Sequence, residues 1–282
     1  MIKRILIPLD SSPYSDSAID FGCFMSKITG AHLTGLVTLD LPGIEKSIGP
    51  IPIGGIYYAE KLEKSKQAEA EKHIHRLLEK FKKKCEAAGI PHREAEFQGS
   101  PSKRIIQESI FYDAVVMGLR TYFNFEEIGH SGDSLENIID QTITPIYGIP
   151  EKLELPPAVQ EKIKVLIAFD GSLPAARALQ RFTQLARPDI FEVKLLTSSD
   201  DKTQADYYLN QAETYLRCHE ITTITKEYTS DNIITVLESQ FLDWAHLVVV
   251  GVHSKKGLLD FMVGSLTRSL IKMGRKPLLI GQ

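Results

Sequence analysis

Short apolar runs alternate along the chain with longer amphipathic segments, and this alternation predicts strands followed by helices. Residues 5–9 are all apolar, which is typical of a strand covered on both faces. A serine pair and Pro13 favour a helix start, and apolar positions continue through residues 15–28. The first half should further contain strands at 32–39, 92–97, 114–117 and 146–149, and helices at 61–88, from 102 to 109 and at 134–140. Alternating strands and helices predict an α/β fold with ligands at the carboxyl ends of parallel strands.

The second half of the chain repeats the first. Residues 5–12 match 165–172, residues 113–118 match 246–251, and residues 144–148 match 276–280. Because self-similarity at this spacing indicates copies of one unit, we expect two tandem doubly wound domains. Each should hold a five-stranded parallel sheet flanked by helices. A proline-rich, charged stretch predicts a linker at 151–162 between domains at 1–150 and 163–282.

Composition narrows the function classes. A length of 282 residues suits two domains, and a formal charge of −3 predicts no general attraction to nucleic acid or membranes. No apolar run is long enough for a membrane span, and the first residues lack a signal-peptide pattern, so we expect a cytoplasmic protein. Cys23, Cys85 and Cys218 have no metal-ligand spacing and predict free thiols. Cys85 and Cys218 fall late in equivalent helices, where we expect both to be buried.

One loop of the second copy has the residues that a phosphate site needs. Gly251 ends a buried strand, where the chain must turn sharply and leave room for a ligand. Gly264 allows backbone N–H groups to approach phosphate oxygens, and Ser265 begins a helix whose free N–H groups favour anions. Asp170 ends the first strand of this copy, where it can accept hydrogen bonds from a ribose or base.

This pattern resembles that of the universal stress protein family. In that family the sequence G-x-H-G, nine residues and G-(S/T) follows the fourth strand, and here residues 251–254 and 264–265 occupy those places. The resemblance extends over both halves and implies a tandem universal stress protein, in a family where the loop decides whether ATP binds. It also implies that the strand-end aspartate and the residue two before it line the adenosine pocket, with the end of the second strand as another wall. The nucleotide-binding residues expected on this basis are Ala168, Asp170, Ser198, Gly251, His253, Ser254, Gly264, Ser265 and Leu266.

The resemblance further implies how the two copies meet. Last strands in the family pair antiparallel between subunits, so residues 146–149 and 278–280 should pair within this chain as a pseudo-dimer. Such pairing shields two sheet edges. Association of two chains as a homodimer is left open.

The first copy departs from the phosphate-loop pattern. Its loop is one residue longer, Glu126 and Glu127 add negative charge, and Asp133 replaces the serine. A carboxylate at a helix start competes for the N–H groups that a phosphate would use, so we expect a degenerate site. A weak first-copy site would consist of Pro8, Asp10, Gly118 and Gly132.

The second copy carries features that act in opposite directions. Ser254 stands where the family has glycine, and serine disfavours positive φ angles, which weakens phosphate binding. Lys255, Lys256 and Arg268 add positive charge that favours a polyphosphate, although the lysines could be only a solvated turn.

Several of these candidate site residues also have a purely structural interpretation. Asp10 and Asp170 could simply cap the helices that follow them, and Gly251 and Gly264 could serve helix–sheet packing. His253 could be a solvated loop residue, since no partner for a general base is evident. We therefore predict no catalytic or metal-binding residues.

Residues 41–58 are apolar, rich in glycine and proline, and without a counterpart in the second copy. A loop of this length is usually functional or disordered, and its isoleucines argue against disorder. We expect it to cover a cleft or form a subunit contact; the alternative is an idle surface insertion.

The sequence favours a stress-response regulator, not an enzyme, that binds ATP or AMP (or ADP) in its second domain. Mg²⁺ would accompany a triphosphate, although no dedicated carboxylate pair is evident. A protein partner would be needed but is not indicated by any motif. One alternative is a nucleotide-free interaction module with relic pockets. Another is a slow ATP hydrolase, for which no water-activating carboxylate or arginine finger is seen.

Overall fold

The computed structural model describes residues 2–51, 53–120, 133–155, 162–185, 187–252 and 263–281. The elements of the first half are β1 (Arg4–Pro8), α1 (Pro13–Thr29), β2 (His32–Leu39), α2 (Leu41–Ile48), α3 (Ile56–Ala88), β3 (His92–Gln98), α4 (Pro101–Ser109), β4 (Ala114–Gly118), α5 (Asp133–Gln141) and β5 (Ile146–Ile149). Those of the second half are β6 (Ile163–Ala168), α6 (Leu173–Leu185), η1 (Pro188–Ile190), β7 (Phe191–Ser198), α7 (Lys202–Cys218), β8 (Ile224–Thr229), α8 (Ile233–Val236), η2 (Leu237–Phe241), β9 (Leu247–Gly251), α9 (Ser265–Met273) and β10 (Leu278–Gly281).

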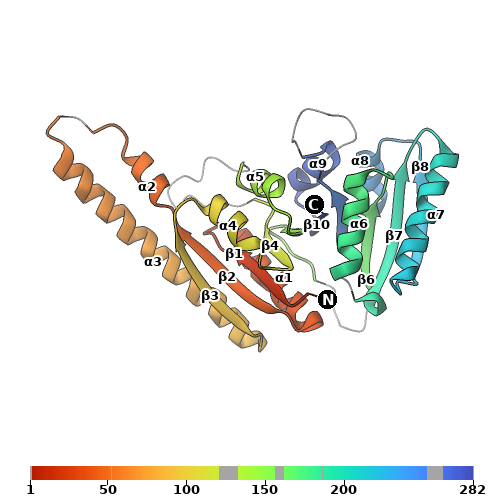
Figure 1. Cartoon of the computed structure of the whole chain (residues 1–282), viewed down its shortest axis with the longest axis horizontal. Coiled ribbons are helices and arrows are strands. Elements are labelled where there is room, and N and C mark those ends of the chain that lie inside the picture. Colours follow the sequence, from red (N-terminus) through yellow and green to blue (C-terminus); the bar gives the residue numbers. More distant parts are fainter. Residues whose placement is uncertain are drawn as a thin grey trace.

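The ten strands of the described residues form one sheet in the order β3-β2-β1-β4-β5-β10-β9-β6-β7-β8 (Figure 1). Neighbouring strands are parallel within each half. At the centre, β5 and β10 pair antiparallel, with Tyr147 opposite Leu279. The predicted α/β fold and the predicted pairing of the last strands are both confirmed.

Helices cover both faces of this sheet because its central strands are apolar on both sides. Alternate residues of β1 divide between two cores: Ile5 and Ile7 join the core beneath α1, α3, α6 and α7, and Leu6 joins the core beneath α4, α5, α8 and α9. Every residue of β4 is buried, as the unbroken apolar run predicted. The two cores therefore hold the strands of the sheet from both faces.

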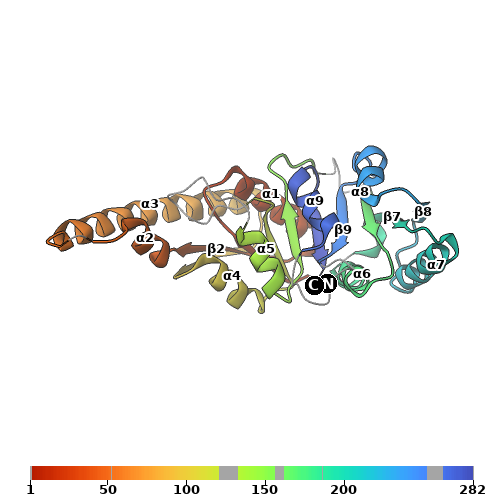
Figure 2. The same cartoon turned by 90° about the horizontal axis from the view of Figure 1, so that it is seen from above.

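The segment 41–58 differs from the predicted loop. Asp40 accepts a hydrogen bond from the Gly43 amide at 3.0 Å and caps α2, while Ile44 packs into the core. The next helix, α3, begins at Ile56, earlier than residue 61. Figures 1 and 2 show α2 and the start of α3 extending away from the sheet.

Apolar side chains near this tip face solvent. They are Ile51, Ile53, Ile56, Tyr57 and Tyr58, with exposed fractions from 53% to 109%. The two expected roles of this segment, covering a cleft and forming a subunit contact, both stay predictions.

The expected burial of the cysteines is confirmed only in part. Cys23 and Cys85 are buried free thiols, as expected. The expected burial of Cys218 is wrong, because this residue ends α7 and its side chain is exposed.

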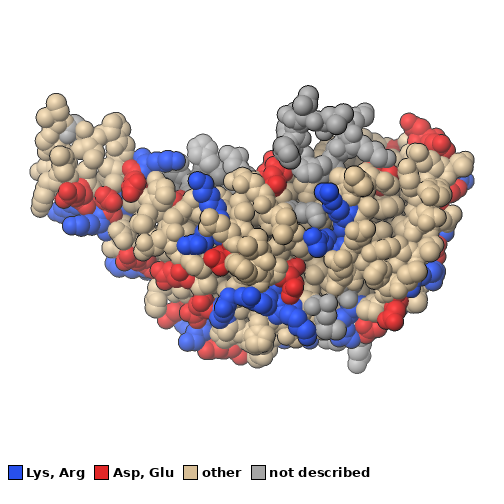
Figure 3. Space-filling view, viewed as in Figure 1, with Lys and Arg blue, Asp and Glu red and all other residues tan. Residues whose placement is uncertain are grey.

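Charges of both signs are interspersed over the face shown in Figure 3. Within the described ranges, no helix combines the length and apolar character that a membrane span requires.

Candidate functional site

A cavity of about 360 Å³ opens at the carboxyl ends of β6, β7 and β9. This volume lies within the range of small-molecule sites, and the position is the one at which parallel sheets bind ligands. It is lined by Ala168, Phe169, Asp170, Ser172, Ala175, Leu196, Ser198, Ile233, Val250, Gly251, Gly264, Ser265, Leu266 and Thr267.

The structure brings most of the predicted nucleotide-binding residues together in this cavity. The predicted residues on its wall are Ala168, Asp170, Ser198, Gly251, Gly264, Ser265 and Leu266. Two others, His253 and Ser254, lie outside the described residues, as do Lys255 and Lys256 of the same loop. The strand ends meet because β6 lies between β7 and β9 in the sheet.

Asp170 is positioned by a tight turn between β6 and α6. Its Oδ1 accepts a hydrogen bond from the Ser172 amide at 2.9 Å. Gly171 adopts a φ of +74°, which glycine tolerates without strain, and lets the chain enter the helix at once. The carboxyl group is half-buried on the cavity wall, so the turn-capping and pocket-lining interpretations hold together.

The matching aspartate of the first half is in a different environment. Asp10 is 1% exposed, and its Oδ1 accepts hydrogen bonds from the hydroxyls of Ser12 and Ser15 at 2.7 and 2.6 Å. The Asp10 amide in turn donates to Ser15 Oγ at 2.8 Å. In the unbroken register of the repeat, Ala175 stands in place of Ser15. Asp10 therefore serves local structure.

Other expected first-half residues lie near the same sheet edge. Pro8 and Gly118 end the paired strands β1 and β4 and are buried. A Cβ at Gly118 would lie 2.4 Å from Cβ of Tyr14, so this side chain packs directly on the glycine. Gly132 lies outside the described residues, and α5 begins at Asp133, where a helix start was expected.

The first turn of α9 forms the floor on which an anion can lie. Gly264 precedes the helix at the capping position and, as a glycine, has no side chain to cap it. Hydrogen bonds hold this turn to β9: the Gly264 amide donates to Val252 O at 2.6 Å, and Thr267 Oγ1 donates to Gly251 O at 2.7 Å. The first amides of a helix lack acceptors within it and carry a partial positive charge, which suits a phosphate.

The packing changes the roles expected for Gly251 and Arg268. A Cβ at Gly251 would lie 2.5 Å from the carbonyl carbon of Pro174, so close packing of α6 already requires glycine there. Arg268 lies with Nε 3.6 Å from Glu136 Oε1 on α5, so its charge is shared with an acidic partner.

Sequence reasoning missed several lining residues. Ile233 comes from α8 and Leu196 from β7, and their contribution depends on packing between elements distant in sequence. Thr267 could have been noted, since it follows Ser265 by half a turn. Among the described residues, no group of three or more His, Cys, Asp or Glu side chains could hold a metal ion.

Comparison with known proteins gives a consistent family. The model of the universal stress protein family matches residues 1–144, about half of the chain. A universal stress protein from Archaeoglobus fulgidus DSM 4304 is similar over 99% of this chain and 96% of its own, with 20% identity and a TM-score of 0.70. A functionally unknown protein from Pseudomonas aeruginosa PAO1 is similar over 99% and 92%, with 13% identity and a TM-score of 0.57. At these identities the likeness shows the fold alone. No curated protein matches the chain at a significant level.

Proposed function

Because the chain belongs to the universal stress protein family, we propose that it is a cytoplasmic stress-response regulator that binds an adenine nucleotide, ATP or AMP, in its second half. The proposal includes two tandem domains of this family, at 1–150 and 163–282, joined by a linker. The observation that carries it is the open cavity of about 360 Å³ between Asp170 and the first turn of α9.

The cavity offers different chemistry at its two ends. At the strand ends, Ala168, Asp170 and Ser198 provide a mixed wall on which adenosine can lie, with the Asp170 carboxylate as acceptor for ribose hydroxyls. The Ser198 hydroxyl donates to Asp231 O at 2.8 Å, which fixes this wall. At the other end, the amides of Ser265 and Leu266 begin a helix and suit phosphate oxygens.

The proposal is one of binding without catalysis. Among the described lining residues, Asp170 is the single carboxylate, and the Ser172 amide already holds it. A Mg²⁺ ion accompanying ATP would be held mainly by the phosphates, as is common for this cation.

Equilibrium dialysis with labelled ATP and AMP tests the proposal. Wild type should bind one nucleotide per chain, and Gly264→Val should abolish binding because the branched side chain would obstruct the phosphate end. Gly132→Val is the matched change in the first half and should leave binding intact. Absence of binding by wild type, or equal binding by Gly264→Val, would refute it.

A second pair of variants separates the two aspartates. Asp170→Asn should weaken nucleotide binding, because the amide replaces one acceptor by a donor. Asp10→Asn should lower the free energy of unfolding instead, since two hydroxyls donate to that carboxylate.

The competing proposal is a nucleotide-free interaction module. The environment of Asp10, together with Tyr14 packed on Gly118, favours that role for the first half. The open cavity beside Asp170 supports binding in the second half. Slow hydrolysis is the weaker alternative and would appear as ADP release from bound ATP.

A further inference from the structure

Two cysteines that are distant in sequence meet in the core of the first half. Cys23 lies on α1 and Cys85 on α3, and both are buried free thiols. The Cys85 thiol donates a hydrogen bond to the sulfur of Cys23. Sulfur atoms in contact need only a small side-chain adjustment to reach the roughly 2 Å of a disulfide bond. The pair is therefore placed for a covalent link between α1 and α3.

Ion pairs between the same two helices place the cysteines together independently of the thiols. Asp16, Asp20 and Cys23 follow one another at helical spacing and so share one face of α1. On that face, Lys84 Nζ lies 2.8 Å from Asp20 Oδ1 and donates to Asp16 O at 3.1 Å. Because Lys84 immediately precedes Cys85, these contacts bring the end of α3 alongside Cys23.

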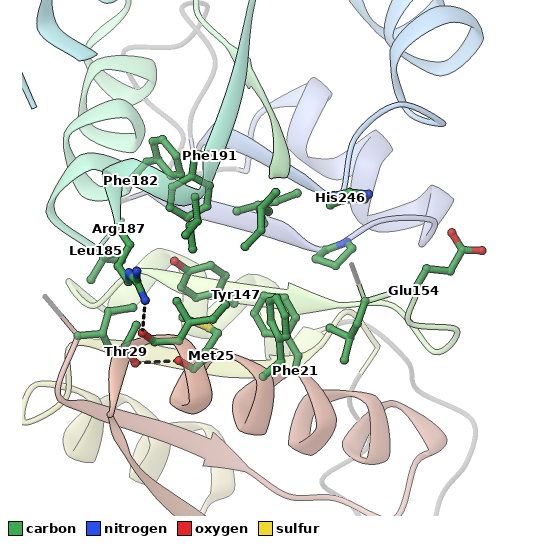
Figure 4. A pocket seen from close by; sticks show the side chains of 18 residues that line it. Phe21, Met25, Thr29, Tyr147, Glu154, Phe182, Leu185, Arg187, Phe191 and His246 are labelled. Atoms are coloured by element: carbon green, nitrogen blue, oxygen red, sulfur yellow. Dashed lines mark hydrogen bonds between the residues drawn. The ribbon is translucent and has the colours of Figure 1, made fainter. Parts of the chain in front are cut away.

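The opposite face of α1 is engaged elsewhere. Figure 4 shows Phe21 and Met25 at the seam between the two halves, where they line a cavity of about 60 Å³. Cys23 lies two positions from each of them, which is about 200° of rotation around the helix, and it does not line that cavity. The helix is thus held between the second half on one side and α3 on the other, with Cys23 on the side of α3.

The thiol pair is particular to the first half. In the unbroken register of the repeat, Thr183 takes the place of Cys23, and its hydroxyl donates to Gln180 O at 2.8 Å. The one cysteine of the second half, Cys218, is exposed at the end of α7. The second half therefore cannot form an equivalent link within itself.

The two thiols differ in what they can do. Cys23 keeps 7% of its surface exposed and Cys85 none, so a small oxidant can reach only Cys23. The hydrogen bond from Cys85, helped by the positive charges of Lys27 and Lys84, lowers the pKa of the Cys23 thiol and favours the reactive thiolate. The same hydrogen bond and burial raise the pKa of Cys85, which stays protonated. This difference suits one thiol that reacts first and a second that completes the link.

We propose that Cys23 and Cys85 form a reversible disulfide when the chain meets a hydroperoxide. The Cys23 thiolate attacks the O–O bond, takes up one oxygen as a sulfenic acid, and releases an alcohol, or water from hydrogen peroxide. The Cys85 sulfur then attacks the Cys23 sulfur, the S–O bond breaks, and the hydroxyl leaves as water with the proton of the Cys85 thiol. The thiols are oxidised and the hydroperoxide is reduced. A small dithiol restores both thiols by exchange.

Oxidation of the full chain in a Cys218→Ser background tests the proposal, because this background keeps only the two buried thiols. Hydrogen peroxide should remove both thiols from an Ellman titration performed in urea. Mass spectrometry of the digested protein should then find a peptide linked through Cys23 and Cys85, which dithiothreitol cleaves. The oxidised protein should melt about 5 °C or more above the reduced one, because the link restricts the unfolded chain.

Variants of each core cysteine separate the two roles. Cys85→Ala should leave Cys23 as a sulfenic acid that dimedone traps, since the second thiol is missing. Cys23→Ala should leave the Cys85 thiol unoxidised, because that residue is fully buried. Two thiols titrated in urea after treatment that oxidises free cysteine, or loss of thiols without the linked peptide, would overturn the proposal. The linked peptide is sought in protein that keeps both core cysteines, so this outcome does not depend on how the variants fold.

Discussion

The hydroxyl of Ser15 lies 2.6 Å from the carboxylate of Asp10, and Ala175 occupies the place of this serine in the second half. The difference is one oxygen atom. In the first half that oxygen engages the aspartate, and in the second half the matching aspartate lines a cavity. We therefore expect Ala175→Ser to weaken ATP binding by about tenfold, because the new hydroxyl would compete for the Asp170 carboxylate.

Ala176→Ser is the matched control for this change. Ala176 is the next residue on α6 and does not line the cavity, so equilibrium dialysis should give wild-type affinity. Equal ATP affinity of Ala175→Ser and wild type would contradict the explanation based on the hydroxyl.

Gly251→Ala should lower the free energy of unfolding by about 1–3 kcal/mol, because the added methyl group would overlap the backbone of Pro174. The loss should be measurable by urea denaturation without nucleotide. An unchanged free energy of unfolding, with loss of ATP binding alone, would instead assign Gly251 to the ligand only.

The three thiols should differ sharply in reactivity. Cys218 is exposed, whereas Cys23 and Cys85 are buried, so Ellman's reagent should titrate one thiol rapidly in the folded protein and all three in urea. Cys218→Ser should remove the rapid phase. Rapid reaction of two thiols in native protein would show that the core around α1 and α3 opens readily.

Glu213 should make stability depend on pH. Lys226 Nζ lies 2.6 Å from Glu213 Oε2 and Arg217 Nη2 lies 2.8 Å from Oε1; these cations hold the pKa of Glu213 below its ordinary value. The stabilisation is thus complete above the unfolded pKa of about 4.3 and is lost as the pH falls through the folded pKa. At pH 7, Glu213→Gln should cost about 0.5–1 kcal/mol, a small value because the partners are partly exposed.

Urea unfolding at pH 7 and near pH 3 measures this difference, with Glu69→Gln on the exposed surface of α3 as the control. The deficit of Glu213→Gln should shrink at the lower pH. A deficit of equal size at both would show that the carboxylate charge is not its cause.

Much of the fold follows from local patterns. Mainly apolar runs predicted β2 and β5 with the bounds that the structure shows, because a strand buried on both faces leaves little room for charged residues. Asp170 and Gly251 could be assigned to one site, since parallel strands end at a common edge. Gly264 could be assigned to the same site because its spacing from residues 251–254 matches the family pattern.

Features set by contacts between distant segments could not be predicted. The composition of residues 41–58 indicates a loop, whereas Asp40 caps a helix there and Ile44 finds a core contact. Exposure of Cys218 depends on where α7 ends. The acidic loop suggested a degenerate first copy, but the packing of Tyr14 on Gly118 became evident only in three dimensions.

The antiparallel contact between β5 and β10 lies within one polypeptide, so dilution cannot separate its two sides. A pair of identical subunits would dissociate as the protein became scarce, and any substitution would appear on both sides at once. Covalent linkage keeps the two sides at a high effective concentration at any cellular abundance. It also allows each half to change alone, so that a serine can remain beside Asp10 while an alanine stands beside Asp170.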